Sequence, residues 1–208
     1  MVTMSGQASN GHCIPSTYDM RILDRFLISP SFRRFKDIEL IVWKAPTLPY
    51  IKVNMDGSHR NTTTAYGGIF RDQFGAYMGG FSANLGDCSV FEVEIMGFIF
   101  AMELAARHHW RFIWIEGDST SALLSFSNPS LVSIWWRNRW HNCFSHGMQI
   151  LSSHIFREGN GCADKLACHG HAVTDLVWWG TMSAFVRGIS LGTRQNYLIF
   201  VFRNFCLL

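Results

Sequence analysis

Four acidic residues that are far apart in the sequence stand where a folded chain can bring carboxylates together. Asp56 and Asp118 each follow a run of strand-forming residues, Glu94 lies near the start of a long apolar helix, and Asp164 opens a later helix. Carboxylate oxygens are the ligands that hard divalent cations prefer. If the elements that carry these acids converge, the sequence predicts a metal site.

The first of these elements is residues 51–58, which alternate apolar and polar side chains before reaching Asp56 and Gly57. This period predicts a strand that ends at the acid. Residues 65–71 and 76–81 predict two further strands joined by a short turn that Gly75 closes. Together the three strands are expected to form an antiparallel meander.

Residues 90–108 contain no proline, and apolar side chains fill nearly every position from Val93 to Ala105, which predicts a helix buried over most of its circumference. Its first turns contain Glu92 and Glu94. The helix dipole favours negative charge there by about 0.3–1 kcal/mol, which accounts for Glu92. Glu94 lies deeper in the apolar run, where a carboxylate needs a partner or a metal ion.

Residues 112–116 predict a buried strand that delivers Asp118, and residues 119–126 predict a helix after it. A strand that follows a long crossover helix is expected to lie parallel to the first, so both acids reach the same edge of the sheet. Residues 151–156 predict a last strand. Asp164 then falls in the first turn of a helix, where a lone acid would be an ordinary surface residue.

Residues 131–148 place Trp136, Trp140 and Phe144 four positions apart, which predicts a helix with one apolar face packed on the sheet. Arg137 and Arg139 would then face solvent. The alternative is that these arginines and aromatic rings bind a nucleic-acid backbone, and the two interpretations are compatible.

The composition describes a chain of 208 residues with 48% hydrophobic residues, enough for one domain with extensions. The formal charge of +3 allows a nucleic-acid partner without requiring one. The start of the chain has no signal-peptide pattern, and no apolar run approaches the ~20 residues that span a bilayer. We therefore expect an intracellular protein that is neither secreted nor bound to a membrane, with nucleus and cytoplasm both open. The six cysteines show no C-x-x-C pair, so reduced thiols are expected and neither disulfides nor zinc are.

The expected domain covers residues 43–172. Residues 1–42 form an N-terminal extension, with no fixed structure to about residue 20 and a short helix in residues 21–36 that breaks near Pro30. Residues 173–208 form a partly helical tail. Its aromatic residues, among them Trp178 and Trp179, either pack on the sheet or form an exposed patch for a partner.

Five ordered motifs with these spacings resemble the plant ribonuclease H-like domains, which are often found at the C-terminal end of retrotransposon-derived reverse transcriptase proteins. The resemblance covers residues 43–172. The motifs are Lys52-Val53-Asn54-Met55-Asp56-Gly57, Gly67-Gly68-Ile69-Phe70-Arg71-Asp72, Glu94 in its helix, Glu116-Gly117-Asp118-Ser119, and His154-Ile155-Phe156-Arg157-Glu158-Gly159-Asn160 through Ala163-Asp164-Lys165-Leu166-Ala167. Ser58 and Gly117 depart from the family, which usually has alanine and cysteine there.

The resemblance implies an α/β ribonuclease H-like fold, with a five-stranded mixed sheet flanked by helices. It implies an enzyme that hydrolyses the RNA strand of an RNA–DNA hybrid with two Mg²⁺ ions, for which Mn²⁺ can substitute. The catalytic residues would be the metal ligands Asp56, Glu94, Asp118 and Asp164, together with His154.

Contacts to the hybrid are expected from residues near this acidic group, where small polar groups can recognise 2′-hydroxyls. The basic handle of some bacterial members has no room here, which predicts weak binding by the isolated domain. The runner-up is an inactive nucleic-acid-binding module from a degenerate retroelement, and a third alternative is an interaction protein without nucleic-acid affinity. The expected contact residues are Gly57, Ser58, Asn61, Ser119 and Asn160.

Overall fold

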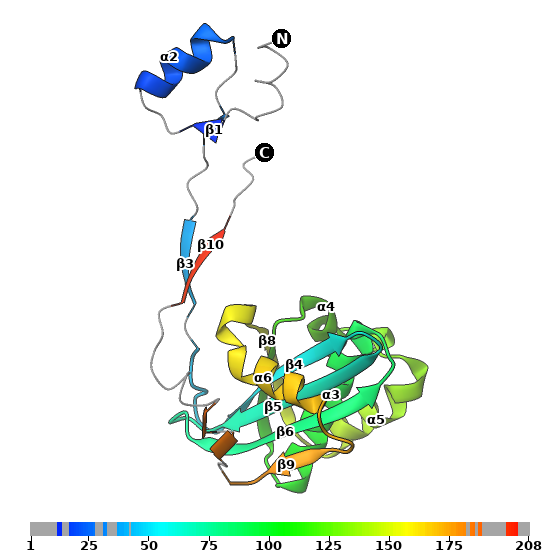
Figure 1. The fold of residues 1–208 in the computed structure, drawn as a ribbon. Coiled ribbons are helices and arrows are strands. Elements are labelled where there is room, and N and C mark those ends of the chain that lie inside the picture. The colour runs from blue at the N-terminus through cyan, green and yellow to red at the C-terminus, as the bar shows by residue number, and fades with distance from the viewer. Residues whose placement is uncertain are drawn as a thin grey trace. The chain divides into compact units, whose positions relative to one another are not determined.

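The structure is a computed structural model that describes residues 12–13, 17–27, 31–32, 37–41, 43–181, 184–185, 187–188 and 199–203 (Figure 1). The chain divides into two compact units. One comprises Ile41–Ile199, and the other comprises Met1–Leu40 with Phe200–Leu208. The expected functional residues all lie in the first, larger unit.

The larger unit is built on a six-stranded mixed sheet with the strand order β8-β7-β4-β5-β6-β9. Strands β4, β5 and β6 form the expected antiparallel meander, and β7 and β8 pair in parallel beyond β4. The strands are β4 (Ile51–Arg60), β5 (Thr63–Arg71), β6 (Tyr77–Gly86), β7 (Phe112–Gly117), β8 (Gln149–His154) and β9 (Val177–Trp179).

The predicted mixed architecture is confirmed, with one strand more than the five expected. The additional strand is β9, which lies beyond residue 172 and pairs antiparallel with β6. A three-residue strand has too short a pattern to be recognised in a sequence. Gly79 of β6 makes room for it, because a Cβ atom there would lie 2.1 Å from the ring of Trp178. Of the two alternatives for the aromatic tail residues, packing on the sheet applies to Trp178 and Trp179.

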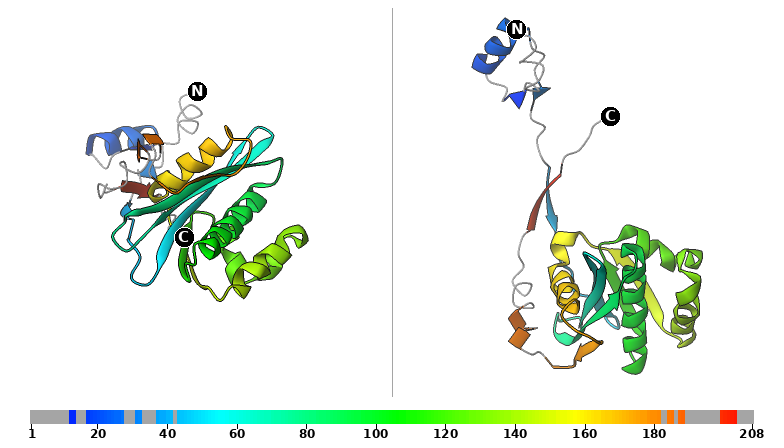
Figure 2. Two further views of the ribbon diagram at one scale, coloured as in Figure 1. Left: turned by 90° about the horizontal axis from the view of Figure 1, so that it is seen from below. Right: turned by 45° about the vertical axis from the view of Figure 1, so that its right-hand side comes forward.

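Helices cover both faces of this sheet, as Figure 2 shows: α6 lies on one face, and α3 and α5 lie on the other. Helix α3 packs against β4 and β5 on its face, and α6 packs against β4, β5 and β6 on the opposite face. The helices are α3 (Val90–Arg107), α4 (Thr120–Leu123), α5 (Ile134–Ser145) and α6 (Gly161–Gly170), with 3₁₀ turns at Leu124–Phe126, Pro129–Leu131 and Arg157–Gly159.

Helix α3 is the central helix of the core, and eleven of its eighteen residues are buried, as its apolar sequence predicts. Its N-terminus is closed by a capping box, in which Ser89 Oγ accepts from the backbone N–H of Glu92 and Glu92 Oε2 accepts from the backbone N–H of Ser89. Glu92 is therefore a capping residue. Gly97 lets the helix approach β4, because a Cβ there would lie 2.3 Å from Met55 Cε.

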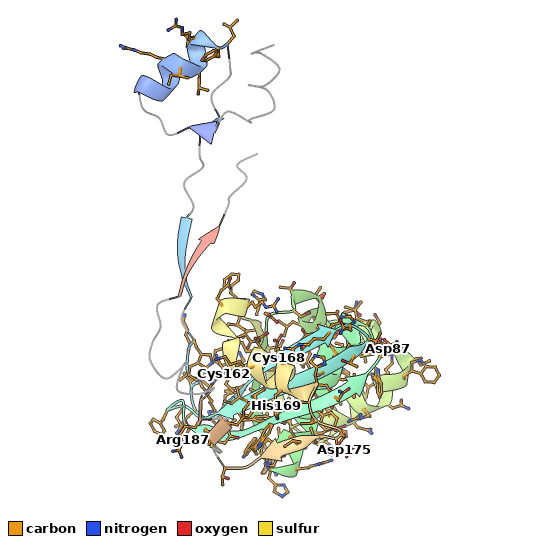
Figure 3. All side chains as sticks on the ribbon, viewed as in Figure 1. Asp87, Cys162, Cys168, His169, Asp175 and Arg187 are labelled. Atoms are coloured by element: carbon orange, nitrogen blue, oxygen red, sulfur yellow. The ribbon has the colours of Figure 1, made fainter. Side chains whose placement is uncertain are left out.

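Helix α6 lies close to the other face of the sheet (Figure 3 labels Cys162, Cys168 and His169 along it). Gly67 allows this contact, since a Cβ atom would lie 2.4 Å from the backbone nitrogen of Ala167. Ser82 Oγ donates to the carbonyl of Leu166 at 2.6 Å and fixes the helix on the sheet. These contacts hold the first turn of α6, which contains Asp164, at one edge of the sheet.

Of the three aromatic residues predicted to form the apolar face of α5, Trp140 is buried, Trp136 is half-buried and Phe144 is exposed. The helix packs on α3 rather than directly on the sheet. Trp140 is fully buried, and Cys143 Sγ contacts the carbonyl oxygen of Ile99 in α3. The reason is that α3 already covers this part of the sheet. Arg139 was expected to face solvent or nucleic acid. Instead its guanidinium forms an ion pair of 2.7 Å with Glu103 of α3.

Outside the sheet, the helix expected in residues 21–36 is instead α2 (Thr17–Arg25) and begins earlier. Two small strand pairings are also described: β1 (His12–Cys13) with β2 (Ser31–Phe32), and β3 (Asp37–Ile41) with β10 (Ile199–Arg203). Among the described residues, no helix has the length and apolar character needed to cross a membrane.

Candidate metal-binding site

Asp56 lies inside β4, at the point where the pairing of β4 with its neighbour β7 ends. The last pair of the parallel ladder is Met55 with Gly117, whereas the antiparallel ladder with β5 continues to Arg60. The strand therefore extends beyond the acid at which it was expected to end, because the hairpin with β5 prolongs it. Asp56 still occupies the edge where the parallel strands diverge, as predicted.

Glu94 and Asp118 reach the same edge from different elements. Glu94 comes from the first turns of α3, and Asp118 follows β7, where Ser119 caps α4 by accepting from the backbone N–H of Ala122. Carboxylate oxygens of Asp56, Glu94 and Asp118 all lie within 4.8 Å of one another. Three of the four predicted acids thus form one group.

Burial makes this group electrostatically unfavourable without a cation. Asp56 and Glu94 are only 4% and 5% exposed, and Asp56 Oδ2 and Glu94 Oε2 accept no hydrogen bond from any described residue. Burial, followed by repulsion from Asp118 and Glu94, raises the pKa of Asp56 to about 9. Burial and Asp118 raise the pKa of Glu94 to about 8. Protons or cations must therefore neutralise the group at neutral pH.

Gly57 holds Glu94 in this position. Its backbone N–H donates a hydrogen bond to the Glu94 carboxylate, which opposes the rise of that pKa. A Cβ atom on residue 57 would lie 2.8 Å from Val93 Cγ1 and 3.2 Å from Glu94 Cδ. The absence of a side chain at this position is thus what allows α3 to bring its carboxylate to β4.

Asp164 stands beside the three-carboxylate group without joining it. The charge of Asp164 adds to the rise of the Asp56 pKa, after burial, Asp118 and Glu94. Its Oδ1 lies 3.7 Å from an Nη atom of Arg157, and both side chains are partly exposed. An exposed pair of this kind contributes little to stability, about 0–1 kcal/mol, so it can exchange for another partner at small cost.

His154 is the last residue of β8, directly across from Gly117 of β7. Its side chain is exposed, and among the described residues its ring contacts that of Phe156 edge-on at 5.1 Å between centroids. The parallel pairing of β7 with β8 thus places the imidazole of His154 opposite Gly117, the residue that precedes Asp118 in the sequence.

The residues expected to contact nucleic acid are distributed unevenly around this edge. Asn61 is exposed in the β4–β5 hairpin, Ser58 is half-buried and Ser119 caps α4. Asn160 differs, because it is buried and its Nδ2 donates to the carbonyl of Met55 at 2.7 Å. That amide supports β4 next to Asp56 and offers no accessible atom to a ligand.

Two residues near the site were not singled out as functional from the sequence. Arg157 pairs with Asp164, and its positive charge also lowers the pKa of Glu94. His171 links the two strands of the hairpin, with Nε2 3.1 Å from Ser58 Oγ and Nδ1 3.0 Å from Thr63 Oγ1. The available signal for Arg157 was its place between His154 and Asp164 in the last motif.

Comparison with known proteins agrees with this architecture. Residues 54–170 match the family described as Reverse transcriptase-like. The chain is 29% identical over 170 residues to an Arabidopsis thaliana protein named "Putative ribonuclease H protein At1g65750". That alignment covers 75% of this chain and 27% of the relative, so the chain spans about a quarter of that protein's length.

Solved structures of ribonucleases H share the fold at low identity. The RNase H1 of the archaeon Halobacterium salinarum superposes with a TM-score of 0.52 at 21% identity, over 59% of this chain and 98% of that one. The N-terminal RNase H domain of rv2228c from Mycobacterium tuberculosis gives 0.54 at 17% identity, over 59% and 94%. The LC11-RNase H1 crystallised with an RNA/DNA hybrid gives 0.51 at 18% identity, over 57% and 94%. With more than half of its residues matched to the family and a ribonuclease H fold around its acidic edge, this chain belongs to the reverse transcriptase-like family of ribonuclease H-like domains.

Proposed function

We propose that this protein is a divalent-metal-dependent endonuclease that hydrolyses the RNA strand of RNA–DNA hybrids. The observation that carries the proposal is the group formed by Asp56, Glu94 and Asp118 at the edge of a ribonuclease H-like sheet. A buried acidic group of this kind has little structural value by itself, because it opposes folding once its members ionise. Its position in a known nuclease fold supports a catalytic role.

The donor set fits Mg²⁺ or Mn²⁺. All ligand atoms are hard carboxylate oxygens, and two of them, Asp56 Oδ2 and Glu94 Oε2, are buried without a hydrogen-bond partner among the described residues. Asp164 would complete the set of ligands by exchanging Arg157 for a cation. Two bound ions would supply Lewis-acid activation of water and neutralise charge on the leaving oxygen.

The remaining roles belong to residues around the acids. The exposed imidazole of His154 is suited to carry a proton to or from the reaction centre, since histidine is the side chain most often used for proton transfer in enzymes. The guanidinium of Arg157 is placed to bind a phosphate oxygen. Ser58, Asn61, Ser119 and the backbone of Gly57 are the proposed contacts to the hybrid, with small polar groups suited to 2′-hydroxyls.

A second candidate function is nucleic-acid binding without turnover. The observation in its favour is that Asp164 stands outside the three-carboxylate group and pairs with Arg157. If this arrangement persists when divalent ions are present, the site lacks its fourth acid. The protein would then bind hybrid and cleave it weakly or not at all.

Incubation with an end-labelled RNA–DNA hybrid, with and without Mg²⁺, distinguishes these functions. Asp56→Asn should abolish cleavage, whereas Asp175→Asn should retain it, since Asp175 is an exposed acid near β9 (Figure 3). Hybrid binding without any Mg²⁺-dependent product would favour the second candidate. Cleavage that persists in the Asp56→Asn variant would refute the proposed function.

A further inference from the structure

A cluster of buried polar side chains lies under the proposed site and takes no part in it. Lys52, Asn54, Arg71 and Glu116 are between 0% and 6% exposed, and all four project from the sheet face opposite α3. None of them belongs to the carboxylate group, in which Asp56, Glu94 and Asp118 are the members. Burying this many polar groups is costly unless each is paired, so the cluster needs an explanation.

Glu116 is the centre of this cluster and accepts hydrogen bonds from both neighbouring strands. From β4, Lys52 Nζ donates to its Oε1 at 3.0 Å and Asn54 Nδ2 donates to its Oε2 at 2.9 Å. From β8, Ser153 Oγ lies 3.4 Å from Oε1. A single side chain thus connects the three strands β4, β7 and β8.

The donors are themselves held in place. Lys52 Nζ also donates to the carbonyl of Lys44 at 2.7 Å and lies 3.6 Å from the ring centroid of Trp114. Trp114 Nε1 donates to Ser153 Oγ at 2.6 Å, and Trp43 Nε1 donates to Asn54 Oδ1 at 2.7 Å. The cluster is therefore connected throughout, and its geometry is met in only one alignment of the strands.

The apolar face of the same strands constrains that alignment less strictly than the polar face. On the α3 side, Val53 and Met55 of β4 lie beside Ile115 and Gly117 of β7. A slip of two residues would keep the same face inward and would replace one apolar contact by another. On the polar face the same slip would separate Asn54 from Glu116 and leave buried charges unpaired.

The acids of the proposed site stand two residues beyond this pair. Asn54 is opposite Glu116 in the ladder, and two further residues along the strands are Asp56 and Asp118. On the other side Glu116 is opposite Ser153, and the next residue of β8 is His154. The alignment that satisfies Glu116 is the alignment that brings Asp56, Asp118 and His154 to one edge.

We infer that Glu116 is a positioning residue, which aligns β4 and β8 on β7 and thereby sets the separation of Asp56, Asp118 and His154. It acts through Asn54, Lys52 and Ser153 and does not bind the metal ions itself. This inference deepens the proposed function and rests on it for its catalytic consequence. The alignment itself can be measured separately.

The test compares Glu116→Ala, Glu116→Gln and Asn54→Ala with Ile115→Ala, a control that opens a cavity on the opposite face of the same strand. Amide hydrogen exchange of residues 56–58 and 117–119 should be about tenfold faster in Glu116→Ala than in Ile115→Ala at matched global stability. Mg²⁺ affinity by calorimetry should fall about 10- to 100-fold in Glu116→Ala and remain unchanged in Ile115→Ala. Glu116→Gln keeps an acceptor oxygen, so its amide exchange rates and its Mg²⁺ affinity should lie between those of Glu116→Ala and those of the wild-type protein.

In hybrid cleavage, Glu116→Ala should lower kcat by a larger factor than it raises KM, because the loosened residues include two of the metal ligands, whereas the proposed hybrid contact Asn61 lies outside the loosened segments. Equal exchange rates and equal Mg²⁺ affinities in Glu116→Ala and Ile115→Ala would overturn the inference. If Glu116→Ala does not fold, Glu116→Gln and Asn54→Ala carry the same comparison. If the wild-type protein cleaves no hybrid, the proposed function fails, and the exchange rates still decide whether Glu116 aligns the strands.

Discussion

Replacing Asp56 by asparagine is expected to stabilise the metal-free protein while abolishing hybrid cleavage. The carboxyl group of Asp56 has a pKa of about 9 in the folded protein, against an ordinary value of 3.8. Folding therefore takes up a proton between these two pH values, and the free energy of unfolding falls as pH rises from 3.8 to about 9. Asparagine has a similar shape and no charge, so the Asp56→Asn variant should not lose this part of its free energy of unfolding as the pH rises.

The magnitude follows from the pH interval. Neutral pH lies about three units above the ordinary pKa of an aspartate, and each unit corresponds to ~1.4 kcal/mol. The free energy of unfolding that Asp56→Asn restores at pH 7 therefore has an upper bound of about 4 kcal/mol. Relaxation around the charge and sharing of protons with Glu94 reduce this, and we expect about 2 kcal/mol at pH 7. For a protein of this size, 2 kcal/mol raises Tm by about 4–8 °C.

The assay is thermal unfolding followed by circular dichroism at pH 5, 7 and 9, in EDTA and in excess Mg²⁺. The Tm advantage of Asp56→Asn in EDTA should grow from pH 5 to pH 9. In Mg²⁺ the wild-type protein should regain stability, by about 2.7 kcal/mol at 100 times the dissociation constant, and the variant should gain less. Asp175→Asn, which changes an exposed acid, should remain within about 0.5 kcal/mol of wild type.

Two results would refute this reasoning. One is a Tm difference between Asp56→Asn and wild type that does not change with pH, which would mean that Asp56 ionises normally. The other is a variant less stable than wild type in EDTA at pH 9, which would mean that the carboxylate is paired in the metal-free protein.

Three further substitutions test the packing around the site. Gly57→Ala should lower the free energy of unfolding by about 1–3 kcal/mol in urea denaturation, since its Cβ would meet Val93 at 2.8 Å, and should weaken Mg²⁺ binding measured by calorimetry. His171→Ala removes two hydrogen bonds of the β4–β5 hairpin and should cost about 1–2 kcal/mol in the same assay, with Mg²⁺ affinity unchanged. Trp140→Ala should cost about 3–5 kcal/mol, because this ring is fully buried between α5 and the core. A loss below 1 kcal/mol for Trp140→Ala would contradict the packing of α5 on α3.

The positions of Asp56, Glu94 and Asp118 were predictable because each depends on local periodicity and on one rule of topology. Strand and helix patterns located the three elements, and the parallel arrangement after a crossover helix placed two of the acids at one edge. Glu94 could be distinguished from Glu92 because the helix dipole accounts for a carboxylate at the N-terminus, whereas Glu94 lies deeper in the apolar run. In the structure Glu92 caps the helix.

Other features depend on contacts that no local pattern encodes. Asp164 was expected among the metal ligands, and its pairing with Arg157 depends on the side-chain geometry of a turn. Strand β9 depends on the space that Gly79 leaves on a distant strand. Asn160 reads as an exposed polar residue in its motif, yet the carbonyl of Met55 makes it a buried support of β4.

Strand β4 shows why the acidic group can persist although it opposes folding. On one face Val53 and Met55 contribute apolar burial to the main core, and on the other Lys52 and Asn54 bind Glu116. Asp56 follows on that polar face, next to groups whose hydrogen bonds already hold β4 against β7. The unfavourable charge is thus placed where the backbone cannot move to relieve it, and neutralisation by a proton or a divalent cation is the route that remains. A site of this kind should bind metal more tightly as pH rises from 5 to 9, since protons and cations compete for the same oxygens.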